Sequence, residues 1–231
     1  MTTPIKHLNR DLLITIDGPA GAGKTTISKL LARRLGYRYL DTGALYRGVA
    51  KAAQDQGVAP DDDAGLARLC DRIQLTLEES ADGLRLMLNQ MDITDTIRTQ
   101  AISMLASAVS ARPLVRDFLL QTQRTIGQQK KVVVEGRDMG TVVFPDADVK
   151  FFLIADARVR AQRRFAELSA AGARDIDLLA VEEDMARRDR NDSTRSVAPL
   201  QPAADAIHID STRMGIDAVV ETMLLHINQL F

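Results

Sequence analysis

One stretch near the start of the chain, Leu12 to Thr26 (LLITIDGPAGAGKTT), constrains the fold more than any other. Its first residues form an unbroken apolar run with β-branched members, which is typical of a strand buried on both faces. The glycines that follow Asp17 allow a tight turn in which successive backbone N–H groups point toward one centre. Apolar residues at helical spacing from Ile27 to Leu35 then predict a helix that Gly36 ends. The stretch therefore predicts a strand, a tight turn and a helix in immediate succession.

The spacing Gly18-x4-Gly23-Lys24-Thr25 is that of a phosphate-binding P-loop. The N-terminus of the helix carries about half a positive charge, and Lys24 adds a full one. The hydroxyl of Thr25 or Thr26 is predicted to support Mg²⁺, which such sites hold mostly through water and phosphate oxygens. We predict that a nucleoside triphosphate binds through Gly18, Pro19, Ala20, Gly21, Ala22, Gly23, Lys24, Thr25 and Thr26.

Four further short apolar segments alternate with helical patterns, at residues 37–40, 131–135, 149–155 and 206–209. Strands that alternate with helices indicate a parallel sheet covered on both faces. The predicted fold class is therefore α/β, a P-loop NTPase fold with a five-stranded parallel sheet. Residues 1–41, 129–156 and 201–231 are predicted to form its core.

Two long excursions, at residues 42–128 and 157–200, interrupt this core. Within the first, residues 74–94 alternate apolar and polar side chains with a period of two, which predicts a small antiparallel sheet. The second excursion is charged and helical and breaks at Ala171-Gly172. A core with two mobile flaps is the simplest architecture for such a chain.

The charge balance excludes some partners. With 30 basic and 31 acidic residues, the formal charge is -1, so no global field favours nucleic acid or a membrane. No segment has the length and apolarity of a membrane span or a signal peptide. The single cysteine, Cys70, lies among apolar residues and suits a reducing compartment. We expect a cytoplasmic protein.

A P-loop leaves three reaction classes: a nucleotide switch, an ATPase, or a kinase with a small-molecule acceptor. The Asn-Lys-x-Asp motif of a GTPase is absent, and the apolar segment 131–135 ends in Glu135 without the Asp-Glu pair usual in ATPases. Arginines scattered beside hydroxyls, carboxylates or glycines favour a kinase with a phosphorylated acceptor, because phosphoryl transfer depends on positioning and charge neutralisation. These arginines are Arg47, Arg137, Arg188 and Arg195. A solvated helix face with i,i+4 ion pairs is instead predicted for Arg160, Arg163, Arg164 and Arg187.

Five segments carry a resemblance that extends over almost the whole chain: IDGPAGAGKTT, YLDTGALYRGVA, IRTQ, VVVEGRDMGTVVFPDADVKFFL and RRDRNDSTRSVAPLQPAADA. In these segments, and in their order, the chain resembles the bacterial cytidylate kinases, a branch of the nucleoside monophosphate kinases. GRDMGTVVFPDA, and RDxxDSxR followed by APL, are far more specific than the P-loop alone. The resemblance implies ATP-dependent phosphorylation of CMP and dCMP by in-line transfer, with Mg²⁺ as cofactor. It also implies that residues 42–128 are a monophosphate-binding region and residues 157–200 a lid.

The resemblance also assigns residues. It implies that Lys24, Arg137 and Arg195 neutralise charge during transfer. The residues implied to bind CMP are Asp41, Thr42, Arg47, Ser107, Arg116, Arg137, Asp138, Arg188, Asp192 and Arg195. Among them, Arg47, Arg137 and Arg195 match phosphate-binding positions, and Ser107, Arg116 and Asp138 match positions that read the base. Arg188 and Asp192 match positions near the ribose.

Several alternatives stay open at this point. A carboxylate at Asp138 could accept from the cytosine amine, or it could anchor its own loop by accepting from backbone N–H groups. Many family members have Gly after the P-loop lysine where this chain has Thr25, so the threonine that supports Mg²⁺ is not fixed. The chain could prefer UMP or another monophosphate, or it could be a P-loop regulator without turnover. The resemblance favours a monomer.

Overall fold

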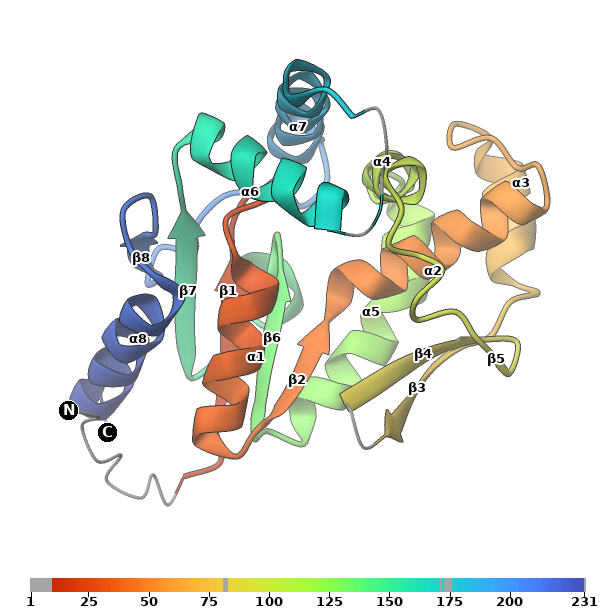
Figure 1. The fold of residues 1–231 in the computed structure, drawn as a ribbon. Coiled ribbons are helices and arrows are strands. Elements are labelled where there is room, and N and C mark those ends of the chain that lie inside the picture. The colour runs from red at the N-terminus through yellow and green to blue at the C-terminus, as the bar shows by residue number, and fades with distance from the viewer. Residues whose placement is uncertain (1–9, 81–82, 171, 173–175, 231) are drawn as a thin grey trace.

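The computed structural model describes residues 10–80, 83–170, 172 and 176–230. Its main sheet consists of β1 (Leu13–Asp17), β2 (Arg38–Asp41), β6 (Val132–Gly136), β7 (Val149–Ile154) and β8 (Ile207–Asp210). These strands lie in the order β2-β6-β1-β7-β8, and every pairing is parallel (Figure 1). The predicted five-stranded parallel sheet is confirmed. Because Asp17 is paired with Gly136, and Asp41 with Glu135, the polar ends of β1, β2 and β6 meet at one edge.

Helices cover both faces of this sheet, as predicted. On one face, α1 (Lys24–Leu35) packs against α8 (Ile216–Leu230), and both bury apolar side chains against Ile14, Ile16 and Phe151. On the other face, Val132, Val134 and Met139 belong to a second apolar cluster. That cluster includes a π-helical turn (Met139–Val143) and side chains of α5 (Pro113–Gln128). Period-two alternation along β1 and β6 thus supplies both cores.

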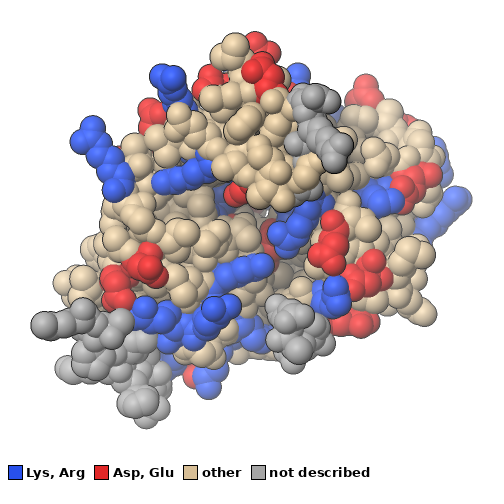
Figure 2. Space-filling model, in the orientation of Figure 1, with Lys and Arg blue, Asp and Glu red and all other residues tan. Residues whose placement is uncertain are grey.

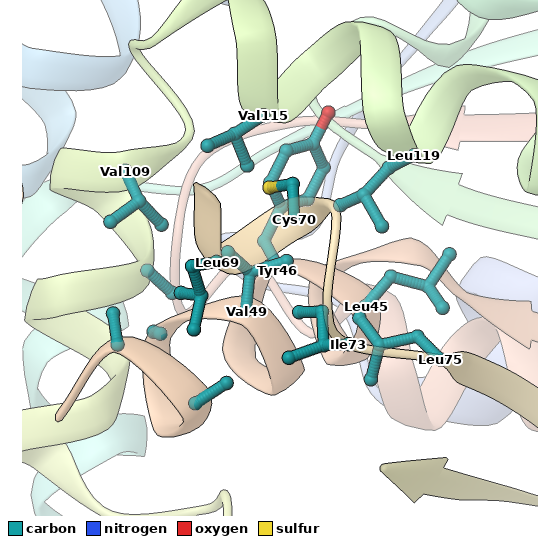
Figure 3. Packing of buried hydrophobic residues seen from close by; sticks show 14 of the residues in the cluster. Leu45, Tyr46, Val49, Leu69, Cys70, Ile73, Leu75, Val109, Val115 and Leu119 are labelled. Carbon is teal, nitrogen blue, oxygen red and sulfur yellow. The ribbon is translucent and has the colours of Figure 1, made fainter. Parts of the chain in front are cut away.

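The segment from residue 42 to 128 has a core of its own. It comprises α2 (Thr42–Asp55), α3 (Asp63–Cys70), β3 (Leu75–Ser80), β4 (Gly83–Leu88), β5 (Met91–Asp92), α4 (Gln100–Val109) and α5. The strands pair antiparallel in the order β3-β4-β5, which confirms the predicted insert. Figure 3 shows its buried side chains; the Tyr46 hydroxyl points away from Leu45, Ile73 and Leu75, and Cys70 lies within the apolar core.

Two helices, α6 (Ala157–Ala170) and α7 (Leu178–Thr194), follow β7 and pack against each other. A small apolar cluster that includes Ala161, Leu168, Val181 and Met185 joins them. Ala20 of the phosphate-binding loop, which we define as residues 18–26, belongs to the same cluster. The helix pair therefore rests directly on this loop.

Side-chain caps set several helix boundaries. The carboxylates of Asp41, Asp62 and Asp177 and the hydroxyl of Thr99 each accept from a backbone N–H in the first turn of a helix. Such caps satisfy donors that a helix leaves unpaired at its start, so α3 begins at Asp63, earlier than its apolar residues alone suggest. Among the described helices, none is both long enough and apolar enough to cross a bilayer.

Candidate active site

The phosphate-binding loop joins β1 to α1 as the spacing predicts. Gly18 has a φ of 151°, and a Cβ there would lie 2.1 Å from the Leu153 carbonyl oxygen, so the backbone of β7 leaves no room for a side chain. The Lys24 ammonium donates to the carbonyl oxygens of Gly18 and Pro19, each at 2.8 Å. Burial, and then the nearby Arg137, lower the pKa of Lys24 to about 7. Lys24 is thus a buried amine that the backbone of its own loop holds.

A group of oxygen ligands lies beside the loop. The Tyr39 hydroxyl donates to Glu135, which is buried at the end of β6. Burial first, and then Asp41, raise the pKa of Glu135, whereas Lys24, Tyr39 and the Thr25 hydroxyl lower it. The Thr25 side chain thus faces this carboxylate, while Thr26 is exposed. Hydroxyl and carboxylate oxygens of this kind suit a hard cation such as Mg²⁺.

One cavity extends from the phosphate-binding loop to the ends of β2 and β6 and to helices α2, α4, α5, α6 and α7. Figure 2 shows a hollow in this face of the molecule with Lys and Arg side chains along its edges. Most of the predicted site residues line the cavity: Ala20, Gly21, Gly23, Lys24, Thr25, Thr26, Asp41, Thr42, Arg47, Ser107, Arg116, Arg137, Asp138, Arg188, Asp192 and Arg195. Gly18, Pro19 and Ala22 belong to the loop behind this lining, and Gly18 and Pro19 hold Lys24.

Asp41 and Thr42 fix the start of α2. The Asp41 carboxylate accepts from the Ala44 N–H at 3.0 Å and from the Arg47 guanidinium at 2.6 Å. The Thr42 hydroxyl donates to the Glu135 carbonyl at 2.7 Å, which joins α2 to the sheet. The buried Nε of Arg47 has no hydrogen-bond partner among the described residues. Arg47 is therefore oriented by Asp41 and keeps a free donor.

Asp138 also lines the cavity and is almost fully buried. One carboxylate oxygen accepts from Arg116, and the other from Arg195 at 3.4 Å. Burial raises the pKa of Asp138, although both arginines oppose this. The backbone N–H groups of Met139 and Gly140 donate instead to Asp17, at 2.9 and 2.8 Å. Asp17, rather than Asp138, anchors the loop after β6.

A second carboxylate network lies on α7. Asp192 accepts from Arg137 at 2.8 Å and from the Ser107 hydroxyl at 3.1 Å. Burial alone would raise the pKa of Asp192, but Arg137 and then Arg188 hold it below its ordinary value. Burial, and then Arg137, lower the pKa of Arg188 to about 10, which leaves it cationic at neutral pH. Its Nε is buried and has no partner in the described part of the chain.

Comparison with known proteins identifies the family. A family model described as cytidylate kinase matches residues 14–229. The chain belongs to the cytidylate kinase family. Relatives include a cytidylate kinase of Geobacter sulfurreducens, 52% identical over 214 residues that cover 93% of this chain and 91% of the relative. One of Pseudomonas aeruginosa is 50% identical over 216 residues, 93% of this chain and 94% of the relative.

A solved structure resembles the chain in fold alone. This uncharacterized protein from Eubacterium ventriosum has a TM-score of 0.50 and 12% identity, with 95% of this chain and 99% of that one covered. The members of the cytidylate kinase family named above are far closer in sequence. The assignment to the family rests on these relatives and on the family model.

Within this family member, some predicted residues occupy unexpected positions. Ser107, expected beside a base, donates to Asp192, and Arg195, expected beside a phosphate, contacts Asp138 and the Ser110 hydroxyl. The solvated helix face predicted for four arginines is wrong for Arg160 and Arg163, whose guanidinium groups donate to carbonyls of the phosphate-binding loop. Arg164 and Arg187 do pair along their helices, although at i,i+3.

Sequence reasoning missed Tyr46 and Ser110, which also line the cavity. The Arg116 guanidinium lies 5.6 Å from the centre of the Tyr46 ring, in a cation–π arrangement. Helical spacing could have found Tyr46, because it follows Thr42 by one turn of α2 and so shares its face. Ser110 follows Ser107 by three residues at the end of α4, so the same spacing could have found it, but its contacts with Arg116 and Arg195 depend on α5 and on the end of α7.

Proposed function

We propose that the chain transfers the γ-phosphoryl group of ATP to the phosphate of CMP or dCMP, giving CDP or dCDP. One observation carries this proposal: a single cavity joins the phosphate-binding loop to the buried Asp138 carboxylate and its arginines. Two nucleotides could bind there with their phosphates facing each other. Membership of the cytidylate kinase family supports the same reaction.

Recognition of cytosine follows from the chemistry of the residues around Asp138. Cytosine donates through its exocyclic amine and accepts through N3 and O2. A carboxylate can take the amine, while the Arg116 guanidinium, held by Asp138 and the Tyr46 ring, can serve an acceptor. Uracil would instead set a carbonyl oxygen against the carboxylate, which disfavours it by repulsion. The pocket therefore favours a base with an amine at this position.

Transfer itself requires positioning and charge neutralisation. Lys24 and the backbone N–H groups of its loop bind the donor phosphates, while Arg47, Arg137 and Arg188 line the same cavity. The unpartnered Nε atoms of Arg47 and Arg188 are donors suited to phosphate oxygens. An ionised acceptor phosphate needs no protein general base, so these cations suffice.

The oxygens around Thr25 fit a magnesium ion. Thr25 and Glu135 would hold Mg²⁺, directly or through water, because both lie beside the loop and Thr25 is the less exposed of the two threonines. A magnesium ion held there would supply positive charge that offsets the charge of the donor phosphates. Tyr39, through its hydrogen bond, orients the Glu135 carboxylate.

We also infer that residues 42–128 and 157–200 close around the two nucleotides. The first segment has a large apolar cluster of its own, and the second has a smaller one that shares only Ala20 with the phosphate-binding loop, so each can move largely as a unit. Polar contacts rather than a shared core join them; Gln100 of α4 donates to Asp184 of α7, and Ser107 to Asp192. Such contacts can exchange without unfolding either part.

A panel of acceptors tests the function. Release of ADP from ATP is measured with CMP, dCMP, UMP, AMP or dTMP, and CMP and dCMP are expected to give the highest kcat/KM. Comparable rates with AMP and CMP would refute the assignment to cytidylate. ATP binding without ADP release in the presence of any monophosphate would indicate a regulator instead.

A further inference from the structure

Two arginines of α6 contact carbonyl oxygens of the phosphate-binding loop. Arg160 is buried, and its guanidinium donates to the carbonyl oxygens of Ala155 and Ala20, each at 3.0 Å. Arg163 donates to the Ala22 carbonyl at 3.4 Å, and the Ser211 hydroxyl donates to the same oxygen at 3.2 Å. Neither arginine is among the described residues that line the cavity, so two carbonyls of the loop are bound by side chains outside this lining.

These contacts orient the peptide groups of the loop. A trans peptide is planar, and its carbonyl oxygen and its N–H point in opposite directions. When Arg160 holds the Ala20 oxygen outward, the N–H of Gly21 turns inward, and the Ala22 carbonyl does the same for Gly23. Gly21 and Gly23 both line the cavity. Their inward N–H groups are the donors that a phosphate requires.

Arg160 also joins the loop to α7. Its guanidinium lies 2.7 Å from the Asp189 carboxylate, and Asp189 directly follows Arg188, which lines the cavity. The helices also pack closely on the loop: a Cβ at Gly21 would lie 2.7 Å from the Met185 Cε and 2.8 Å from the Arg160 carbonyl oxygen. The guanidinium of Arg160, on α6, therefore contacts both the phosphate-binding loop and α7.

We propose that Arg160 is a positioning residue of the ATP site: it turns the peptide groups of the phosphate-binding loop toward the phosphates and ties that loop to α7 through Asp189. The proposal rests on the proposed function only in taking ATP as the ligand of the loop. Among the described residues, Arg164 lines the cavity from α6, whereas Arg160 is not part of the lining.

A direct contact between Arg160 and phosphate is the competing explanation, and Asp189 separates the two. If Arg160 positions the loop, Asp189→Asn loosens its guanidinium and weakens ATP binding. If Arg160 binds phosphate, the same substitution removes a competing carboxylate, and ATP binds equally well or more tightly. The two explanations predict opposite signs.

The test uses calorimetry with ATP and no acceptor, so it does not depend on which monophosphate is phosphorylated. We expect the Kd for ATP to rise about tenfold in Arg160→Met and about threefold in Asp189→Asn. Arg160→Lys should recover part of the loss, because one of the bonds can re-form. Arg158→Met, an exposed arginine on the same helix, is the matched control and should change the Kd by less than about twofold.

A purely structural role would lower the thermal midpoint and leave the Kd unchanged well below that midpoint. An unchanged Kd in folded Arg160→Met, or tighter binding in Asp189→Asn, overturns the proposal. If Arg160→Met does not fold, Arg160→Lys and Asp189→Asn decide the question. Turnover of CMP by the wild-type protein is measured separately. If CMP proves not to be the acceptor, the result on ATP binding is unaffected.

Discussion

The two groups of residues that line the cavity are built in different ways. The donor site, residues 18–26 with Glu135, depends on a contiguous turn whose backbone supplies most of the donors, with Lys24 as its added cation. The acceptor site, which we define as Asp41, Arg47, Ser107, Arg116, Arg137, Asp138, Arg188, Asp192 and Arg195, consists of side chains from five parts of the chain. Its bonds join residues far apart in sequence, such as Ser107 and Asp192, 85 positions apart.

This difference determines what each site tolerates. Backbone donors persist through most substitutions, so the donor site should fail mainly when Lys24 or the support of the loop is lost. In the acceptor site, Asp138 binds Arg116 and Arg195, and Asp192 binds Arg137. Removing one partner of a buried ion pair leaves the other charge unpaired, so substitutions there should affect several residues at once.

Lys24→Ala should give the largest effect and should leave the acceptor site intact. Loss of a cation that offsets the donor phosphates is expected to lower kcat by about two to three decades. Binding of CMP in the absence of ATP should change by less than about twofold, since the acceptor site depends on other residues. Turnover and CMP calorimetry on the folded variant check both. A kcat close to that of the wild type would mean that the phosphate-binding loop takes no part in the reaction.

Asp138→Asn should change the base preference rather than abolish transfer. The amide leaves the cytosine amine without its acceptor, at a cost of about 1–3 kcal/mol, or about one to two decades in kcat/KM for CMP. UMP should lose much less or gain, because an amide nitrogen can donate to its carbonyl. The thermal midpoint is measured as well, since Arg116 and Arg195 lose a charge partner. Equal losses for CMP and UMP would mean that Asp138 does not read the base.

Lys24 should also make ATP binding depend on pH. Its pKa of about 7 is lowered mainly by burial, and donor phosphates should raise it again. Between the two values the unbound protein lacks a proton that the complex holds, so binding takes up a proton and weakens as the pH rises above 7. Calorimetry from pH 7.5 to 9, which is roughly the window given by this shift, in two buffers of different ionisation enthalpy measures the uptake.

Lys24→Arg is the control for this experiment, because a guanidinium stays protonated throughout the range. Uptake should disappear in this variant. Uptake that persists unchanged would assign the proton to another group and would leave Lys24 charged before ATP binds.

The same difference explains what the sequence could predict. Strand, turn, lysine and helix are local, so the phosphate-binding loop and the parallel sheet were predicted from spacing and periodicity alone. The residues of the acceptor site were found through family resemblance, but their pairings were not, because Arg116–Asp138 and Arg137–Asp192 depend on tertiary structure. The prediction for Arg160 was wrong for a related reason. A charged helix suggested a solvated face, whereas the packing of α6 on the loop buries the Arg160 side chain.

Ser107 gives the smallest predicted effect and the finest test of the acceptor site. Its hydroxyl donates to Asp192, which resemblance places near the ribose, whereas Ser107 itself was expected to read the base. Ser107→Ala should lower kcat/KM about two- to tenfold. If the hydroxyl acts through Asp192, the loss should be larger for CMP than for dCMP, because only CMP has a 2′-hydroxyl for that carboxylate to bind. A contact with the base would give equal losses.

Ser193→Ala is the control: Ser193 is exposed and directly follows Asp192 on α7, and its hydroxyl donates to the carbonyls of Asp189 and Arg190, so its loss should change kcat/KM for either substrate by less than about twofold. Equal losses of kcat/KM for CMP and dCMP in Ser107→Ala would mean that Ser107 contacts the base, and that Arg137 alone orients Asp192.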